Sequence, residues 1–135
     1  MDLVCVVDTS GSMQSETYAR DQNNKLESTG LSVLDVVKHA LNTIVTGLSP
    51  DDTIGIIKFD SSAVTVCSST KCTTTGKAAI KNAIQNLRVG GATNLWGGLE
   101  QGMKMFTRNS DVSNTVCQIS RGANELNLYR LRFRD

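Results

Sequence analysis

An apolar run that ends abruptly in a polar segment constrains the fold of this 135-residue chain more than any other feature. The run, Leu3 to Val7, is typical of a central parallel strand that is covered on both faces. It leads directly into residues 8–13 (DTSGSM), where a carboxylate and two hydroxyls share one glycine-containing turn. Hard oxygen ligands packed so closely suit a divalent cation such as Mg²⁺ or Mn²⁺.

Strand-like and helix-like patterns alternate along the rest of the chain. The expected elements are a helix over 31–48, a strand over 53–59, a short edge strand over 63–67, a helix from 75, a helix from 95 to 106 and a fourth strand over 115–119. This order predicts an α/β fold with a doubly wound, mostly parallel, Rossmann-like sheet. Such sheets bind ligands at the carboxyl ends of their strands, where residues 8–13 fall. The polar, aperiodic residues 14–28 are expected to form a surface loop.

Composition excludes some classes of function and favours one cellular location. A net charge of +1 argues against a nucleic-acid or polyanion binder. No apolar stretch is long enough to span a membrane and no secretory leader precedes the first strand, which begins at Asp2. The cysteines at positions 5, 67, 72 and 117 lack zinc-site spacing, so reduced structural thiols are expected, with a Cys67–Cys72 disulfide as the alternative. A cytoplasmic location follows as an expectation.

Two separated motifs resemble one known family. Residues 8–13 follow the pattern D-x-S-x-S-M, which resembles the first metal motif of the von Willebrand factor A domain, the family that also includes integrin inserted domains. Residues 90–96 (GGATNLW) look like the second metal motif of that family, and the resemblance extends from about Asp2 to about Gly122.

The resemblance implies a metal-ion-dependent adhesion site. By that resemblance the hydroxyls of Ser10, Ser12 and Thr93 bind Mg²⁺ or Mn²⁺, and Asp8 acts largely through water and by its charge. An acidic group of a protein partner completes the coordination sphere. The loops around Gly11, Asp60 and Gly91 are expected to shape specificity. Trp96 is expected to pack at the start of its helix, with a place beside the ligand surface as the alternative.

The third family motif departs from the pattern. Relatives follow the fourth strand with a Thr-Asp-Gly-like turn whose aspartate supports the metal, whereas here Arg121 takes that place in Ser120-Arg121-Gly122. A guanidinium has no lone pair to offer and remains cationic. At about 5 Å from a divalent ion it repels by several kcal/mol at an effective dielectric constant near 20, so metal affinity is expected to fall.

The resemblance ends after Gly122. We therefore expect a partial family domain over residues 1–122 and a non-family tail over 123–135. A full domain has two more strands and two more helices, so the fold is expected to be C-terminally truncated, with the edge of the fourth strand exposed and the arginine-rich tail solvated. A shift out of the ancestral reading frame, or reading into an intron, near Ser120 would account for these features together.

The motifs predict a noncatalytic protein-interaction module, and two alternatives stay open. One is a degenerate fragment without metal binding or independent function. The other, less favoured, is a metal-dependent hydrolase or phosphatase. An aspartyl phosphatase needs a second aspartate where Ser10 stands, and His39 is the only histidine available to a serine hydrolase that also lacks its G-x-S-x-G motif. A phosphate-binding loop of the Walker type is absent from the sequence.

Overall fold

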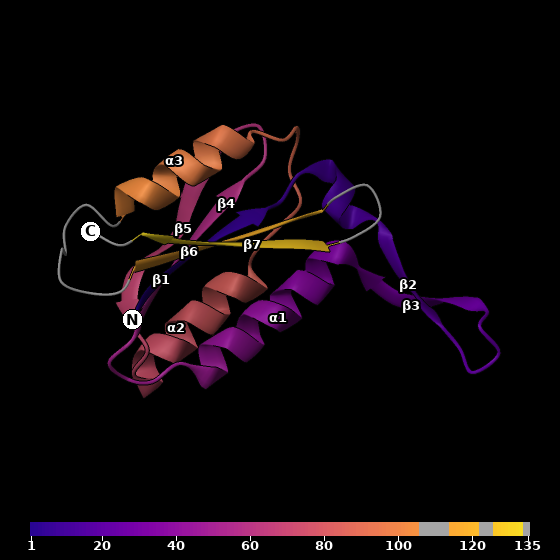
Figure 1. Ribbon diagram of the computed structural model, residues 1–135, viewed down its shortest axis with the longest axis horizontal. Helices are drawn as coiled ribbons and strands as arrows, with labels where there is room; N and C mark the ends of the chain where they lie inside the picture. The colour runs from indigo at the N-terminus through magenta and orange to yellow at the C-terminus, as the bar shows by residue number, and fades with distance from the viewer. Residues whose placement is uncertain (106–113, 122–125, 134–135) are drawn as a thin grey trace.

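The computed structural model describes residues 1–105, 114–121 and 126–133, which form a five-stranded sheet, helices on both of its faces and a separate two-stranded hairpin (Figure 1). In chain order the elements are β1 (Asp2–Asp8), the short 3₁₀ helix η1 (Gly11–Gln14), β2 (Glu16–Arg20), β3 (Leu26–Ser32), α1 (Val33–Gly47), β4 (Thr53–Phe59), β5 (Ala63–Lys71), α2 (Thr74–Gln85), α3 (Leu95–Met105), β6 (Asn114–Arg121) and β7 (Leu126–Phe133). The predicted α/β fold is confirmed.

The sheet has a parallel centre and antiparallel edges, in the order β5-β4-β1-β6-β7. Strand β1 pairs in parallel with β4, with Asp8 opposite Phe59, and in parallel with β6, with Val7 opposite Ile119. Strands β5 and β7 run antiparallel to their neighbours. The turn that follows Asp8 therefore lies at the carboxyl end of the central strand, where two flanking strands end beside it.

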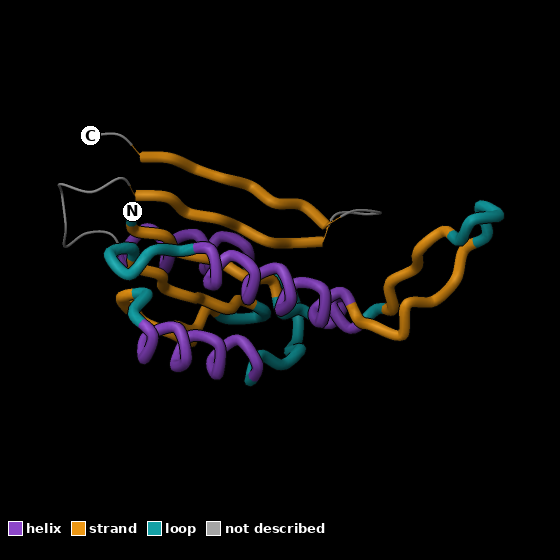
Figure 2. Tube along the Cα trace, turned by 90° about the horizontal axis from the view of Figure 1, so that it is seen from below, coloured by secondary structure: helices purple, strands orange, loops and turns teal. Residues whose placement is uncertain are grey.

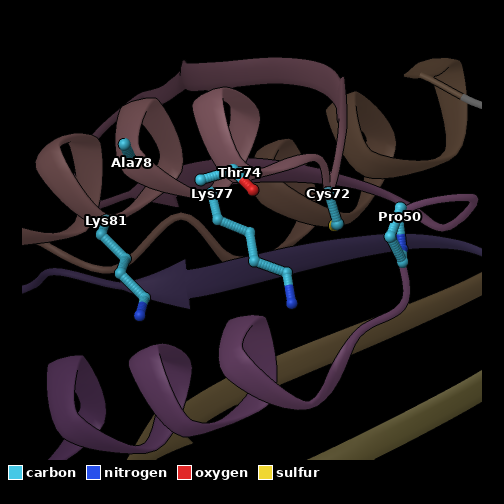
Figure 3. Close-up of a pocket in the computed structure, with 6 residues that line it drawn as sticks. All are labelled: Pro50, Cys72, Thr74, Lys77, Ala78 and Lys81. Atoms are coloured by element: carbon cyan, nitrogen blue, oxygen red, sulfur yellow. The ribbon is translucent and has the colours of Figure 1, made fainter.

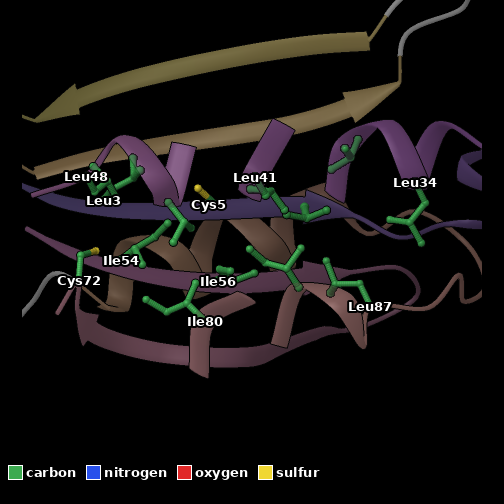
Figure 4. Packing of buried hydrophobic residues seen from close by; sticks show 14 of the residues in the cluster. Leu3, Cys5, Leu34, Leu41, Leu48, Ile54, Ile56, Cys72, Ile80 and Leu87 are labelled. Atoms are coloured by element: carbon green, nitrogen blue, oxygen red, sulfur yellow. The ribbon is translucent and has the colours of Figure 1, made fainter. Parts of the chain in front are cut away.

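Alternation along β1 divides the core into two layers. Leu3, Cys5 and Val7 belong to the larger cluster, which packs against the apolar sides of α1 and α2 (Figure 4). Val4 and Val6 face the other layer, which α3 covers. Figure 1 shows α3 on one side of the sheet and α1 with α2 on the other. Each fully buried aliphatic side chain in these layers contributes about 1.5–3 kcal/mol to folding.

Helix α1 begins at Val33 because Ser32 caps it. The Ser32 Oγ accepts a hydrogen bond from the Asp35 amide at 3.1 Å, and the Asp35 carboxylate accepts one from the Ser32 amide at 3.0 Å. This reciprocal capping box satisfies two amides that a helix start leaves without partners. The hydrogen bond from the Ser32 amide, aided by the Ser32 hydroxyl, lowers the pKa of Asp35. The predicted start at Leu31 was therefore two residues early.

Residues 14–28 were wrongly predicted to be a loop. Most of them belong to a hairpin of β2 and β3 that projects from the body of the molecule, as Figures 1 and 2 both show. In its turn, the Asp21 Oδ1 accepts hydrogen bonds from the amides of Asn23 and Lys25, both at 2.8 Å, and Asn24 takes a left-handed φ of 61°. Because neither face of the hairpin is buried, its sequence shows no alternation of apolar residues.

The edge of β6 was wrongly predicted to be exposed. Strand β7 pairs with β6 along its whole length, from Asn114 opposite Phe133 to Arg121 opposite Leu126. Strand β5 is also longer than the predicted 63–67, although it is an edge strand as expected. The predicted end of the third helix at Phe106 and the domain boundary at Gly122 lie outside the described residues. Among the helices described, none has the length and apolar character needed to cross a membrane.

Candidate metal centre

The turn after β1 gathers three of the predicted ligands. The Asp8 and Ser10 side chains are each only 3% exposed. The Asp8 Oδ1 accepts a hydrogen bond from the Ser10 amide at 2.8 Å, and the Ser10 Oγ lies 3.3 Å from the Ser12 Oγ. An aspartate that bonds the amide two residues later is the usual way to fix such a turn. Asp8, Ser10 and Ser12 therefore form one cluster of oxygens.

The loop before α3 lies against this turn. The Gly90 amide donates to the Thr9 carbonyl at 2.6 Å, and the Gly11 amide donates to the Gly91 carbonyl at 3.0 Å. A Cβ added to Gly11 would lie 3.8 Å from the Gly90 carbonyl oxygen, which shows how closely the two segments approach. The two motifs, about 80 residues apart in the chain, thus meet at one edge of the sheet.

Thr93 occupies the exposed end of that loop. The next residue, Asn94, receives a hydrogen bond at its Oδ1 from the Gly97 amide at 3.0 Å and so stabilises the start of α3. The helix itself is fixed to the sheet through Gly98, where a Cβ would lie 2.7 Å from Phe59 Cδ1. The backbone thereby holds Thr93 at the edge that carries the Asp8 turn, and no described residue hydrogen-bonds its hydroxyl.

The donor set fits a small divalent cation. Within the described part of the chain, the buried Asp8 carboxylate makes no ion pair, and burial of an uncompensated charge is costly. Carboxylate and hydroxyl oxygens are the donors that Mg²⁺ and Mn²⁺ prefer. The described residues include no group of three histidine, cysteine or acidic side chains suited to a metal, so this centre depends on its hydroxyls.

Arg121 ends β6 at the same edge. Because Val7 lies opposite Ile119 in the parallel pair of β1 and β6, the backbone of Ser120 and Arg121 follows beside the Asp8 turn. This position is the one that the sequence comparison assigned to the missing third-motif aspartate. That Arg121 replaces this aspartate stays a prediction.

Asp60 also lies at this edge of the sheet. From the sequence, its loop was expected only to shape the specificity of binding. It follows β4 and is half-buried, and its carbonyl accepts a hydrogen bond from the Asn94 amide at 2.5 Å. A Cβ on Gly90 would overlap its Oδ2, so the carboxylate lies directly against the loop that carries Thr93. The signal available in the sequence was an acid placed directly after the predicted strand over 53–59.

Trp96 was wrongly expected to be packed. It lies in the first turn of α3 with 69% of its surface exposed, three residues after Thr93. Gly98 takes the close-packed position against the sheet instead. A large exposed aromatic side chain beside the candidate metal centre is available to a binding partner.

A pocket of about 390 Å³ lies at the other end of the sheet, between the end of α1 and the start of α2 (Figure 3). Lys77, which lines it, donates hydrogen bonds from its Nζ to the carbonyls of Thr46 and Leu48 and so caps α1. Burial raises the pKa of Cys72 at its wall, so this thiol stays protonated at neutral pH. Cys67 and Cys72 are free, and the alternative Cys67–Cys72 disulfide is absent.

The fold and this edge together define an α/β domain that presents oxygen donors at the carboxyl end of its central strand. The sequence model of the von Willebrand factor type A domain matches residues 3–123, and the chain belongs to that family. A comparison with curated protein sequences found no match.

Solved structures share the fold at low sequence identity. The PilB minor pilin from Streptococcus sanguinis is 22% identical with a TM-score of 0.73, over 90% of this chain and 30% of that one. The von Willebrand factor type A protein from Catenulispora acidiphila is 18% identical with a TM-score of 0.70, over 85% and 25%. The pilus adhesin SpaC from Lactobacillus rhamnosus GG is 24% identical with a TM-score of 0.59, over 82% and 13%. This chain spans about half or less of the length of the first solved chains that it matches.

Proposed function

We propose that this chain is a noncatalytic protein-interaction module that binds an acidic group of a partner through Mg²⁺ or Mn²⁺ at Asp8, Ser10, Ser12 and Thr93. The observation that carries the proposal is the buried Asp8 carboxylate, which has no described ion-pair partner and lies beside two serine hydroxyls. The hydrogen bonds that hold the 90–91 loop on this turn support a role for Thr93 at the same centre.

Each residue has a distinct part in this proposal. The hydroxyls of Ser10, Ser12 and Thr93 would hold the cation, and Asp8 would contribute its charge from a site where protein screens it from water. A cation held there would supply a Lewis-acidic position for a carboxylate from the partner. Trp96, exposed next to Thr93, offers apolar surface around that contact.

The noncatalytic part of the proposal rests on which side chains lie near the centre. The chain's sole histidine, His39, is exposed on α1, and none of the hydrogen bonds described for the Asp8 turn includes it. The buried Cys72 thiol belongs to the pocket at the opposite end of the sheet. Phosphoryl transfer by an aspartyl nucleophile needs a second aspartate as general acid, and Ser10 stands at that position.

The solved relatives support an interaction role by their fold. One is a minor pilin and another is a pilus adhesin. At these identities the likeness concerns architecture, and the partner of this chain is identified only by the chemistry of the edge: a protein segment that offers a carboxylate.

Selection from a random peptide library, once in Mn²⁺ and once in EDTA, tests this function. We expect the Mn²⁺ selection to enrich peptides that contain aspartate or glutamate, and we expect EDTA to release them. Replacing the enriched acid with its amide should abolish binding, as should Asp8→Asn in the protein. Peptides that bind equally well in EDTA, or that ignore both substitutions, would contradict the proposal.

A further inference from the structure

The central strand has a charged residue on each side of its carboxyl end. Asp8 lies opposite Phe59 of β4, and the parallel pair with β6 runs through Val7 opposite Ile119. Asp60 and Arg121 are therefore each one register step beyond the pair that includes Asp8, on opposite flanks of β1. The family pattern takes its second carboxylate from the β6 flank, where this chain has an arginine, and the β4 flank carries an aspartate.

The surroundings of Asp60 fix its carboxylate at that flank. Its Oδ1 accepts hydrogen bonds from the Ser62 amide at 3.2 Å and the Ser61 hydroxyl at 3.4 Å. Its Oδ2 lies against Gly90, and only the missing Cβ of that glycine leaves room for it. The Gly90 amide in turn bonds the Thr9 carbonyl between Asp8 and Ser10. One glycine thus separates the Asp60 carboxylate from the backbone of the metal turn.

Asp60 is also a partly buried acid without a described counterion. The ion pairs of the described residues join Met1 to Asp52 and Lys104 to Glu100, and neither includes Asp60. Two carboxylates without a described ion pair therefore lie at one edge of the sheet, Asp8 at the end of β1 and Asp60 directly after β4. Like charges so placed repel each other unless a cation lies near both.

We propose that Asp60 supplies the second carboxylate charge of the metal centre from the turn after β4, in place of the third-motif aspartate that the family resemblance predicts at the position of Arg121. This inference rests on the proposed function. Asp60 acts here through its charge, while the direct contacts to a cation would belong to the hydroxyls. This charge keeps the potential of the centre negative although the chain has no aspartate at position 121.

Mn²⁺ affinity, measured by the loss of the free-ion signal in electron paramagnetic resonance, tests the inference without an activity assay. Asp60→Asn keeps the size of the side chain and an acceptor for the Ser62 amide but removes the charge. We expect it to weaken Mn²⁺ binding by about tenfold, since a unit charge close to a divalent ion has a large effect on binding. The loss should shrink as ionic strength rises.

Asp51→Asn is the matched control, because Asp51 is an exposed aspartate just before the opposite end of β4. It should leave Mn²⁺ affinity unchanged. Arg121→Asp, which returns the carboxylate to β6, should restore affinity to the Asp60→Asn protein. In the Arg121→Asp background the effect of Asp60→Asn should be smaller than in the natural chain.

One result would overturn the inference and leave the proposed function intact: Mn²⁺ binds the natural chain, and the Asp60→Asn protein binds it equally well. If Asp60→Ala weakens binding in that case, Asp60 is a packing contact with Gly90. If the folded natural chain does not bind Mn²⁺ at all, both the inference and the proposed function fail.

Discussion

Strands β1 and β3 are both seven residues long, yet different forces hold them in place. Strand β1 pairs on both sides, and all but its first residue are buried. Strand β3 pairs only with β2, and six of its residues are exposed. Apolar burial defines β1, whereas the hairpin depends on cross-strand bonds and a turn fixed by Asp21. A two-stranded hairpin of this kind is marginal by itself, so the body of the domain anchors it.

The difference in burial between these strands decided which elements of the fold could be predicted from the sequence. The strand over 53–59 was predicted to the residue, because its apolar side chains serve both core layers. The hairpin was missed because Tyr18 and Leu26, 60% and 58% exposed, have no alternating apolar partners. Strand β7 was not predicted, because it forms by pairing with β6 and local sequence patterns do not encode such a tertiary contact.

The candidate metal site also has one part that could be predicted from the sequence and another part that only the structure places. Asp8, Ser10 and Ser12 could be placed together because they lie within five residues, and Thr93 could be added only through the family resemblance. The structure supplies the hydrogen bonds that bring the 90–91 loop to the turn. The sequence shows that Asp60 directly follows a strand, but its place beside the Asp8 turn depends on the register of β4 with β1.

The largest expected effect is on the core. Leu41 of α1 is fully buried in the larger cluster. We expect Leu41→Ala to lower the free energy of unfolding by about 2–5 kcal/mol, because it removes apolar burial and leaves a cavity. Urea denaturation measures this value. A loss below about 1 kcal/mol would contradict the importance given to this layer.

The next largest effect on stability is expected at the junction between the hairpin and helix α1. Ser32 is the last residue of β3 and the N-cap of α1. Ser32→Ala should cost about 1 kcal/mol, because it leaves the Asp35 amide without its acceptor. The same urea titration on Ser28→Ala, an exposed serine within β3, provides the control and should show a smaller loss. Equal losses would mean that the cap does not anchor the hairpin to the helix.

A substitution within the hairpin should have little effect. Leu26→Ala is expected to change the free energy of unfolding by no more than about 0.5 kcal/mol, since Leu26 is largely exposed. Thermal melting followed by circular dichroism measures it. A loss comparable to that of Leu41→Ala would show that the hairpin packs against part of the protein and would break the comparison.

The smallest effect is a pH dependence at the edge of the sheet opposite the metal centre. Hydrogen bonds from the Met1 amino group, the Ser49 amide and the Ser49 hydroxyl lower the pKa of Asp52 from 3.8 to about 2. A depressed pKa stabilises the folded state fully above the unfolded value, and this stabilisation is lost as pH falls toward about 2. Acid titrations of stability should therefore be steeper for the natural chain than for Asp52→Asn between pH 3.8 and 2. Identical slopes would contradict this assignment.

The central claim is that the Asp8 turn and the Thr93 loop bind one cation together, and calorimetric titration with Mn²⁺ tests it most directly. The account predicts saturable binding of one ion by the folded natural chain, with affinity at least about tenfold weaker in both Asp8→Asn and Thr93→Val. Thr75→Val, which alters an exposed threonine of α2, should bind as the natural chain does. A folded chain without saturable binding, or binding that survives both site substitutions, would contradict the account.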